Sequence, residues 1–191
     1  MLPVLTPVSV RATAIWTMHV GGGTPMLSHK YFGENSPMSK LEAIEAIKQV
    51  KYRYFRALDC NEWDLFADTL TEDCSAAYSD GKLCLEGREA IAGFMRDNMF
   101  GADFLSMHHG HHPEITLVDE DNATGIWYLE DTIISLARKT RLQGAAIYED
   151  RYRRENGEWR ISATGYRRTF EFVEPLNPEA TMLSNMFAKP R

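Results

Sequence analysis

Apolar residues recur at steps of three and four between residues 39 and 58, which predicts an amphipathic helix. The apolar stripe consists of Leu41, Ile44, Ile47, Val50, Tyr54 and Leu58. Ser39 and Glu42 have the spacing of a capping box, so we expect the helix to begin just after Ser39. The pattern predicts a short second helix over residues 62–70 and a third over residues 87–99.

The rest of the chain has the alternation of strands. Residues 74–78 and 82–85 flank the turn sequence Ser79-Asp80-Gly81 and predict a hairpin. Four longer strands are expected, and they cover residues 107–118, 123–136, 142–154 and 159–172. Helices first and an antiparallel meander last indicate an α+β fold. We expect a strongly curved sheet, with the helices across its concave side closing one deep pocket.

Composition narrows the classes of protein. The 191 residues are 44% hydrophobic and 25% charged, with a net charge of −6, which is typical of one globular domain. The acidic balance argues against a nucleic-acid partner, and no apolar run is long enough to cross a membrane. The three cysteines, Cys60, Cys74 and Cys84, lack the spacing of a zinc site or a disulfide framework, which favours the cytoplasm.

The first 37 residues lack a helical or strand period and contain Pro3, Pro7 and Gly21–Gly23. We interpret residues 1–37 as a flexible N-terminal extension; an arm that docks on a neighbouring subunit is the alternative. A secretory signal is not indicated, because prolines interrupt the apolar stretch. The globular domain is expected to span residues 38–175, followed by a C-terminal tail at residues 176–191.

Four of the six histidines lie within five residues, at His108, His109, His111 and His112. On a regular strand, His108 and His112 face one side while His109 and His111 face the other. A metal site is one interpretation, but it needs ligands from elsewhere in the chain, which spacing alone does not supply. Surface or packing histidines are another. We favour at least one histidine as an acid/base in a pocket, because imidazole titrates near neutral pH.

Three further positions carry candidate chemistry. Asp131 shares a predicted strand face with apolar residues such as Trp127. A buried carboxylate needs a partner, and a histidine could supply it. The alternative is that the strand bulges there and Asp131 is solvated. Tyr54 lies on the helix stripe, so its hydroxyl points inward. Asp59 lies at the helix C-terminus, where the dipole disfavours a negative charge, and such conflicts often mark function; a solvated turn residue is the alternative.

Arg167 and Arg168 are adjacent in the last strand, so one of them faces inward if the strand is regular. An inward arginine would pair with Asp131 or Asp59, or hold an anionic substrate. An ordinary salt bridge at the sheet edge is the alternative.

Several blocks together resemble SnoaL-like members of the nuclear-transport-factor-2-like superfamily, and among these the bile-acid 7α-dehydratases, relatives of scytalone dehydratase. The blocks are residues 47–59 (IKQVKYRYFRALD), 106–116 (SMHHGHHPEIT), 123–131 (ATGIWYLED) and 164–168 (TGYRR). The resemblance extends over residues 38–172. It implies a cone-shaped α+β barrel with the active site in its mouth, a homotrimer, no metal and no organic cofactor.

The resemblance also implies roles for individual residues. Tyr54, Asp59, His108 and Asp131 correspond to catalytic positions, with His108 as base and Asp131 as its dyad partner. Arg168 corresponds to a pocket arginine, and His111 to a supporting position. Trp127 is expected with these two in the substrate-binding group.

The expected activity is that of a hydro-lyase. It would remove water from a hydroxylated 3-oxo-4-ene steroid or bile-acid derivative, with a hydrophobic polycyclic molecule as its partner. His108 would take the carbon-bound proton, and Tyr54 would stabilise the enolate. Two alternatives stay open. One is an isomerase or cyclase of the same family; the other is a non-catalytic subunit, such as the small subunit of a ring-hydroxylating dioxygenase.

Overall fold

The computed structural model describes residues 39–188, and these residues form one compact unit. The extension predicted at residues 1–37 lies outside the described residues. In the part described, the order of helices and strands follows the sequence pattern closely, with differences of a few residues at the ends of elements.

Three helices cover one side of the sheet: α1 (Lys40–Cys60), α2 (Trp63–Asp68) and α3 (Arg88–Asn98). The predicted capping box is confirmed, because the Ser39 side chain accepts from the Glu42 N–H while the Ser39 N–H donates to the Glu42 carboxylate. Asn61 ends α1 in the left-handed region, at φ 58°. Leu41 departs from the predicted stripe: it is 78% exposed, since the buried face of α1 begins later, at Ala43.

The sheet has six strands: β1 (Leu70–Tyr78), β2 (Leu83–Glu86), β3 (Phe104–Leu117), β4 (Asn122–Ser135), β5 (Thr140–Glu155) and β6 (Glu158–Pro175). Their spatial order is β2-β1-β6-β5-β4-β3. The last four form the predicted antiparallel meander. The sequence pattern did not specify how β1 joins them; it pairs in parallel with β6.

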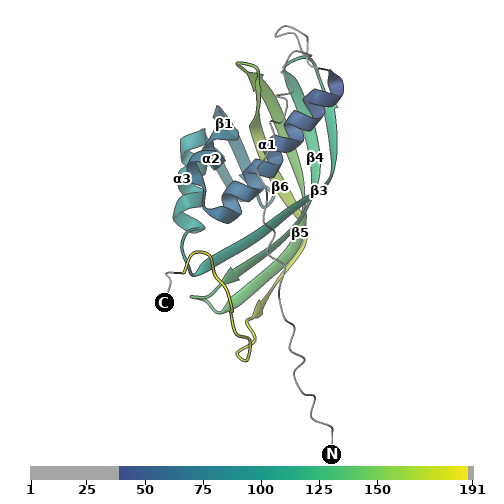
Figure 1. Ribbon diagram of the computed structural model, residues 1–191. Helices are drawn as coiled ribbons and strands as arrows, with labels where there is room; N and C mark the ends of the chain where they lie inside the picture. Colours follow the sequence, from purple (N-terminus) through teal and green to yellow (C-terminus); the bar gives the residue numbers. More distant parts are fainter. Residues whose placement is uncertain (1–38, 189–191) are drawn as a thin grey trace, which may run out of the picture. The chain divides into compact units, whose positions relative to one another are not determined.

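The sheet curves strongly, and α1 runs across its concave side, with α2 and α3 beside β1 (Figure 1). The hydrophobic core lies between the sheet and the helices. It joins Ile47 and Val50 of α1 to Trp127 of β4 and Tyr152 of β5, each no more than 1% exposed. The α+β architecture with a curved sheet is therefore confirmed.

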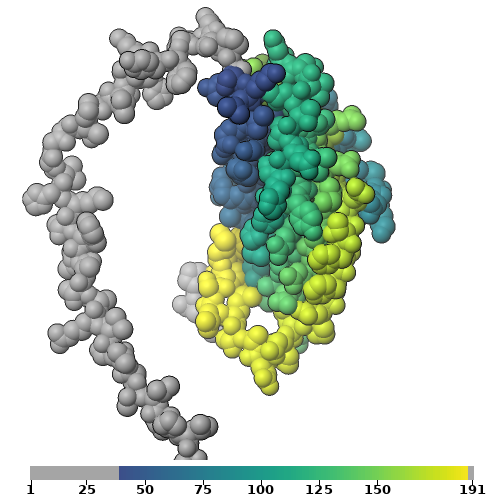
Figure 2. Space-filling model, turned by 90° about the vertical axis from the view of Figure 1, so that its right-hand side faces the viewer, coloured from purple at the N-terminus to yellow at the C-terminus, as the bar shows by residue number. Residues whose placement is uncertain are grey.

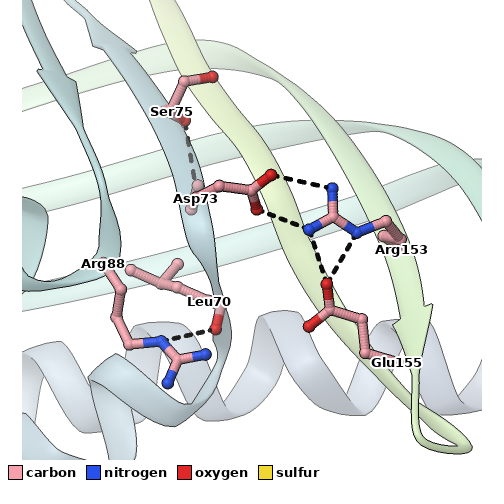
Figure 3. Close-up of polar contacts among 7 residues, drawn as sticks. Leu70, Asp73, Ser75, Arg88, Arg153 and Glu155 are labelled. Atoms are coloured by element: carbon pink, nitrogen blue, oxygen red, sulfur yellow. Dashed lines mark hydrogen bonds and ion pairs between the residues drawn. The ribbon is translucent and has the colours of Figure 1, made fainter.

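An ion pair joins β1 to β5 across the intervening strand β6 (Figure 3). Arg153 on β5 contacts Asp73 on β1, with Nη2 2.6 Å from Oδ1, and also reaches Glu155 at 2.6 Å. Hydrogen bonds from Arg153 lower the pKa of Asp73 to about 2. Because Asp73 is largely exposed, solvent screens this pair and its contribution to stability is small.

Residues 176–188, beyond β6, contact the domain at both ends. The Leu176 N–H donates to the Lys139 carbonyl, and the Asn185 side chain donates to the Ala102 carbonyl. Within residues 39–188, no helix combines the length and the apolar character needed to span a membrane.

Candidate active site

A pocket of about 150 Å³ lies between α1, α3 and the concave side of the sheet. Its polar wall holds His108 of β3, Asp131 of β4 and Arg168 of β6. Four tyrosines from four elements form a second part of the wall; they are Tyr54, Tyr78, Tyr148 and Tyr166. Apolar side chains close the remainder, among them Met95 of α3 and Met99 directly after it. The pocket thus combines titratable groups with an apolar boundary, as ligand sites usually do.

The His108 imidazole is held by Asp59, from the end of α1. Nδ1 of His108 lies 2.6 Å from Oδ1 of Asp59, and the His108 backbone N–H donates to Oδ2 at 2.8 Å. Ser106 adds a third hydrogen bond, from Oγ to Oδ1 at 2.8 Å. Since a carboxylate only accepts, Nδ1 carries the hydrogen and Nε2 is left with a free lone pair. His108 is therefore set in the tautomer that a general base needs.

These contacts explain how a negative charge is tolerated at the C-terminus of α1, where the sequence placed Asp59. Asp59 lies in the last turn of α1, where the unpaired carbonyls disfavour an anion. Strand β3 supplies donors that offset this cost, from Ser106 and twice from His108. The carboxylate is thus a junction between α1 and β3 and not a solvated turn residue.

Phe55 and Gly110 complete the surroundings of the imidazole. The Phe55 ring is parallel to the His108 ring, with an interplanar angle of 5° and centroids 6.0 Å apart. A Cβ at Gly110 would lie 2.5 Å from the Phe55 ring, closer than van der Waals contact allows. The glycine between the paired histidines therefore gives Phe55 the room to stack on His108.

Asp131 has a different partner from the one expected. His108 and Asp131 are opposite each other in the β3–β4 register, and both line the pocket. However, Asp131 binds Arg168 through two parallel hydrogen bonds, of 2.6 and 2.8 Å, and is 1% exposed. The predicted pairing of His108 with Asp131 is corrected to His108 with Asp59. The cause is spatial: Arg168 supplies the planar donor pair that a buried carboxylate requires.

Arg168 is consequently the inward arginine of the Arg167–Arg168 pair, and its guanidinium is committed to a protein carboxylate. Its side chain is 14% exposed, and its Nε also lies 3.0 Å from Glu171. Burial lowers the pKa of Arg168, but the contacts with Asp131 outweigh that effect and raise it overall. Arg167 lies outside, with its side chain 66% exposed.

The tyrosine hydroxyls remain neutral donors. Tyr54 is fully buried, and its hydroxyl is 2.9 Å from that of Tyr78. Burial raises the pKa of Tyr54, Tyr78 and Tyr148 above the ordinary value of 10. At neutral pH these phenols keep their hydrogens, so they can donate to an oxygen on which negative charge develops.

A buried ion pair lies behind the tyrosines. Lys51 of α1 and Asp150 of β5 are both fully buried, with Nζ 2.8 Å from Oδ2. Asp150 also accepts hydrogen bonds from Tyr152 and Thr164. The Lys51 ammonium lies 3.7 Å from the centroid of the Tyr148 ring, a cation–π contact. Burial lowers the pKa of Lys51, and the Asp150 carboxylate opposes that shift.

Two residues expected to bind substrate lie outside the pocket. Trp127 is completely buried in the core, where its indole N–H donates to the Tyr152 hydroxyl at 2.9 Å. His111 is on the opposite side of β3 from His108, 3.8 Å from Glu130. The predicted inward face of β4 is confirmed by its alternating burial. However, α1 covers the strand at Trp127, so only the part of β4 from Leu129 onward lines the pocket.

Sequence reasoning did not identify Lys51, Phe55, Ser106 or the three further tyrosines. Lys51 carried a usable signal, because it falls four residues after Ile47 and three before Tyr54, within the buried stripe of α1. Tyr148 likewise alternates with Ala146 and Asp150 on the inward face of β5. The partners of these residues lie on other elements, and pattern within one element does not reveal them.

A second hollow, of about 820 Å³, lies on strands β2, β1, β6, β5 and β4. It is larger but wide open, and it contains no imidazole. We therefore take the smaller pocket, with its His–Asp pair and neutral phenols, as the candidate active site.

Comparisons with known proteins agree with this fold. A putative scytalone dehydratase from Novosphingobium aromaticivorans superposes with a TM-score of 0.63 at 21% identity, over 74% of this chain and 96% of that one. A hexachlorocyclohexane dehydrochlorinase, LinA-type3 from Novosphingobium barchaimii, gives a TM-score of 0.65 at 18% identity, over 75% and 97%. ActVI-ORFA from Streptomyces coelicolor gives 0.57 at 17% identity, over 66% and 97%.

These structural similarities establish the fold, while a family model identifies the protein family. The model of the SnoaL-like domain matches residues 39–165, which include α1, the histidine-rich strand β3 and Asp131. The chain therefore belongs to the SnoaL-like domain family.

Proposed function

We propose that this protein is a cofactor-independent hydro-lyase that eliminates water from a hydroxylated carbonyl compound. The observation that carries the proposal is the His108–Asp59 pair, with Nδ1 2.6 Å from the carboxylate and the imidazole in the wall of a pocket with neutral phenols. Neighbours named as a putative scytalone dehydratase and a dehydrochlorinase support a lyase, because both reactions break a carbon–heteroatom bond next to a carbon that loses a proton.

The chemistry follows from the residue types. Nε2 of His108 takes a proton from the carbon that a carbonyl acidifies, directly or through a conjugated double bond. The electron pair moves to the carbonyl oxygen, where a hydrogen bond from Tyr54 or Tyr148 stabilises the enolate. Such a donor contributes roughly 100- to 1,000-fold in rate. As the carbon–oxygen bond breaks, the imidazolium returns its proton to the departing hydroxyl, which leaves as water.

Asp59 and Asp131 then have separate duties. Asp59 orients His108 and balances the charge of the imidazolium, as the aspartate of a hydrolase triad does. Asp131 and Arg168 form a closed ion pair that leaves the pocket without net charge from this wall. A neutral, polarisable substrate suits that environment better than an anion.

As the substrate class we propose a hydroxylated 3-oxo-4-ene steroid, on the basis of the resemblance in residues 47–59, 106–116, 123–131 and 164–168. A pocket of about 150 Å³ is smaller than the roughly 300–1,000 Å³ of most ligand sites. A steroid nucleus therefore requires movement of side chains in and directly after α3, where Met95 and Met99 are flexible.

The test is a panel of substrates with two sizes. Hydroxylated 3-oxo-4-ene steroids, free and as coenzyme A thioesters, are compared with single-ring β-hydroxy ketones. Loss of one water by mass spectrometry, together with the ultraviolet absorbance of the extended conjugation, reports elimination. Turnover of the small ketones alone would remove the steroid class and keep the hydro-lyase. Absence of water loss from every compound would contradict the function itself.

An isomerase is the second candidate, because the same base and phenol donors can move a proton between two carbons. Its product has the mass of its substrate, so the same mass spectra separate the two. The His108–Asp59 pair, with His108 in the pocket wall, supports either enzyme over a non-catalytic subunit.

A further inference from the structure

We propose that the outer face of the β3–β4 edge is a binding site for one divalent transition-metal ion, with Zn²⁺ as the best match. The ligands are His109 and His111 of β3 and Glu130 of β4. Their ligand atoms all lie within 4.8 Å of one another, and Nε2 of His111 is 3.8 Å from the Glu130 carboxylate. This site is separate from the pocket and independent of the proposed function.

Strand geometry explains why these three side chains meet. His109 and His111 are two residues apart, so they project from the same side of β3. Glu130 is directly opposite His109 in the antiparallel register. Directly opposed residues have Cβ atoms roughly 5 Å apart, which leaves room for an ion between the side chains. Twelve register pairs join β3 to β4, so the backbone that holds the ligands is well defined.

The donor set has the right chemistry for zinc. Two imidazoles and one carboxylate with an open fourth position make a common zinc arrangement. Tetrahedral zinc needs its ligand atoms roughly 3.3 Å apart, given bonds of about 2.0–2.1 Å. The present separations, from 3.8 Å between His111 and Glu130 up to 4.8 Å within the group, are larger, and side-chain rotation can close them because His109 and Glu130 are exposed. In the part of the chain that the structure describes, these three side chains are not engaged by arginine or lysine.

The proposed metal site and the pocket lie on opposite faces of the same two strands. Along the same two strands, His108 and Asp131 face the concave side, and the next rung, His109 and Glu130, faces outward. β3 is an edge strand of the sheet. It lies exposed beside α1, where its atoms form the teal column in the space-filling view of Figure 2. An ion that bridges His111 and Glu130 would therefore clamp this edge strand to β4 without entering the pocket.

His112 gives an internal control. The register shifts between His111 and Glu114, and His112 has a φ of 48°, so it departs from strict alternation. Its ring centroid lies 5.9 Å from that of His111, yet it does not belong to the group of three ligand atoms. An exposed histidine on the same strand that is not a ligand can thus be removed for comparison.

The experiment titrates the tag-free full chain with Zn²⁺ by isothermal calorimetry near neutral pH. We expect one ion per chain. The variants H109A, H111A and E130Q should each weaken binding by roughly tenfold or more, since even an outer-sphere partner of a metal ligand is worth about 10- to 100-fold. H112A should change binding less than threefold, and unfolding midpoints without metal should stay close to the parent's.

Cobalt gives a second, spectroscopic readout. Co²⁺ should produce the visible absorption of a tetrahedral site, without the thiolate charge-transfer band that binding by the exposed Cys84 would give. Zn²⁺ should raise the thermal midpoint of the parent but not of H109A. Absence of binding, equal weakening by H112A and H109A, or a thiolate band would each overturn the proposal.

Discussion

Asp59 and His108, 49 residues apart in the chain, are joined twice. One carboxylate oxygen holds the imidazole Nδ1 at 2.6 Å, and the other accepts the backbone N–H of the same residue at 2.8 Å. The double contact fixes both the position of β3 and the tautomer of its histidine. The end of α1 therefore acts as the support of the candidate base.

Asp59→Asn should disable that base. The asparagine amide can donate to Nδ1, which moves the ring hydrogen to Nε2 and removes the lone pair that takes the substrate proton. We expect the turnover number to fall roughly 1,000- to 10,000-fold. Nitrogen-15 NMR of His108 should report the change of tautomer even without a substrate. Full turnover by this variant would refute the role of Asp59.

Asp131→Asn is the matched control for that change. Asp131 contacts Arg168 and not His108, so the tautomer of His108 should stay as it is in the parent. The variant should instead lose stability, because it removes the buried carboxylate that binds the Arg168 guanidinium and leaves that cation with the half-exposed Glu171 alone. A tautomer change in this variant would indicate that Asp131, and not Asp59, orients the imidazole.

Gly110→Ala tests the packing around the imidazole. The added methyl group would meet the Phe55 ring at 2.5 Å and Trp127 at 3.3 Å, and both rings are buried. We expect a loss of about 1–3 kcal/mol in the free energy of unfolding, measured in urea, together with reduced turnover as Phe55 shifts off His108. Gly93→Ala on α3 is the control, since its methyl group meets only ordinary contact at 3.7 Å. Equal stability of the two variants would contradict the packing argument.

The sequence predicted the elements well because their signals are local. The helix stripe, the Ser39 capping box and the turn at residues 79–81 each depend on neighbours within a few residues. The inward face of β4, from Ala123 to Asp131, likewise followed from simple alternation. The bulge near His112 broke the same rule on β3, because it depends on how two strands pair.

The site was predictable in its residues but not in its pairings. Tyr54, Asp59, His108, Asp131 and Arg168 are all brought to one region by the fold. Which of two acids binds one imidazole depends on distances of a few ångströms between α1, β3, β4 and β6. Such distances are set by the curvature of the sheet, which no periodicity records.

High pH should unfold the protein through its buried tyrosines. Burial raises the pKa of Tyr54, Tyr78, Tyr148 and Tyr152 above the ordinary value of 10. Above pH 10 the unfolded chain therefore loses protons that the folded chain retains, so stability is complete below pH 10 and falls as the pH rises. Tyrosinate absorbance and circular dichroism should change together for these residues. Ionisation of every tyrosine in one step near pH 10, with the fold intact, would contradict the burial of the pocket phenols.

Lys51→Met should be the most destabilising of these changes. It leaves the Asp150 carboxylate fully buried with hydrogen bonds from Tyr152 and Thr164 but without its cation. Removing one partner of a buried ion pair costs about 3–5 kcal/mol, whereas removing both charges costs far less. The double variant Lys51→Met/Asp150→Asn should therefore be more stable than Lys51→Met alone in urea unfolding. If the double variant is the less stable of the two, the pair contributes through packing against Tyr148 and not through its charge.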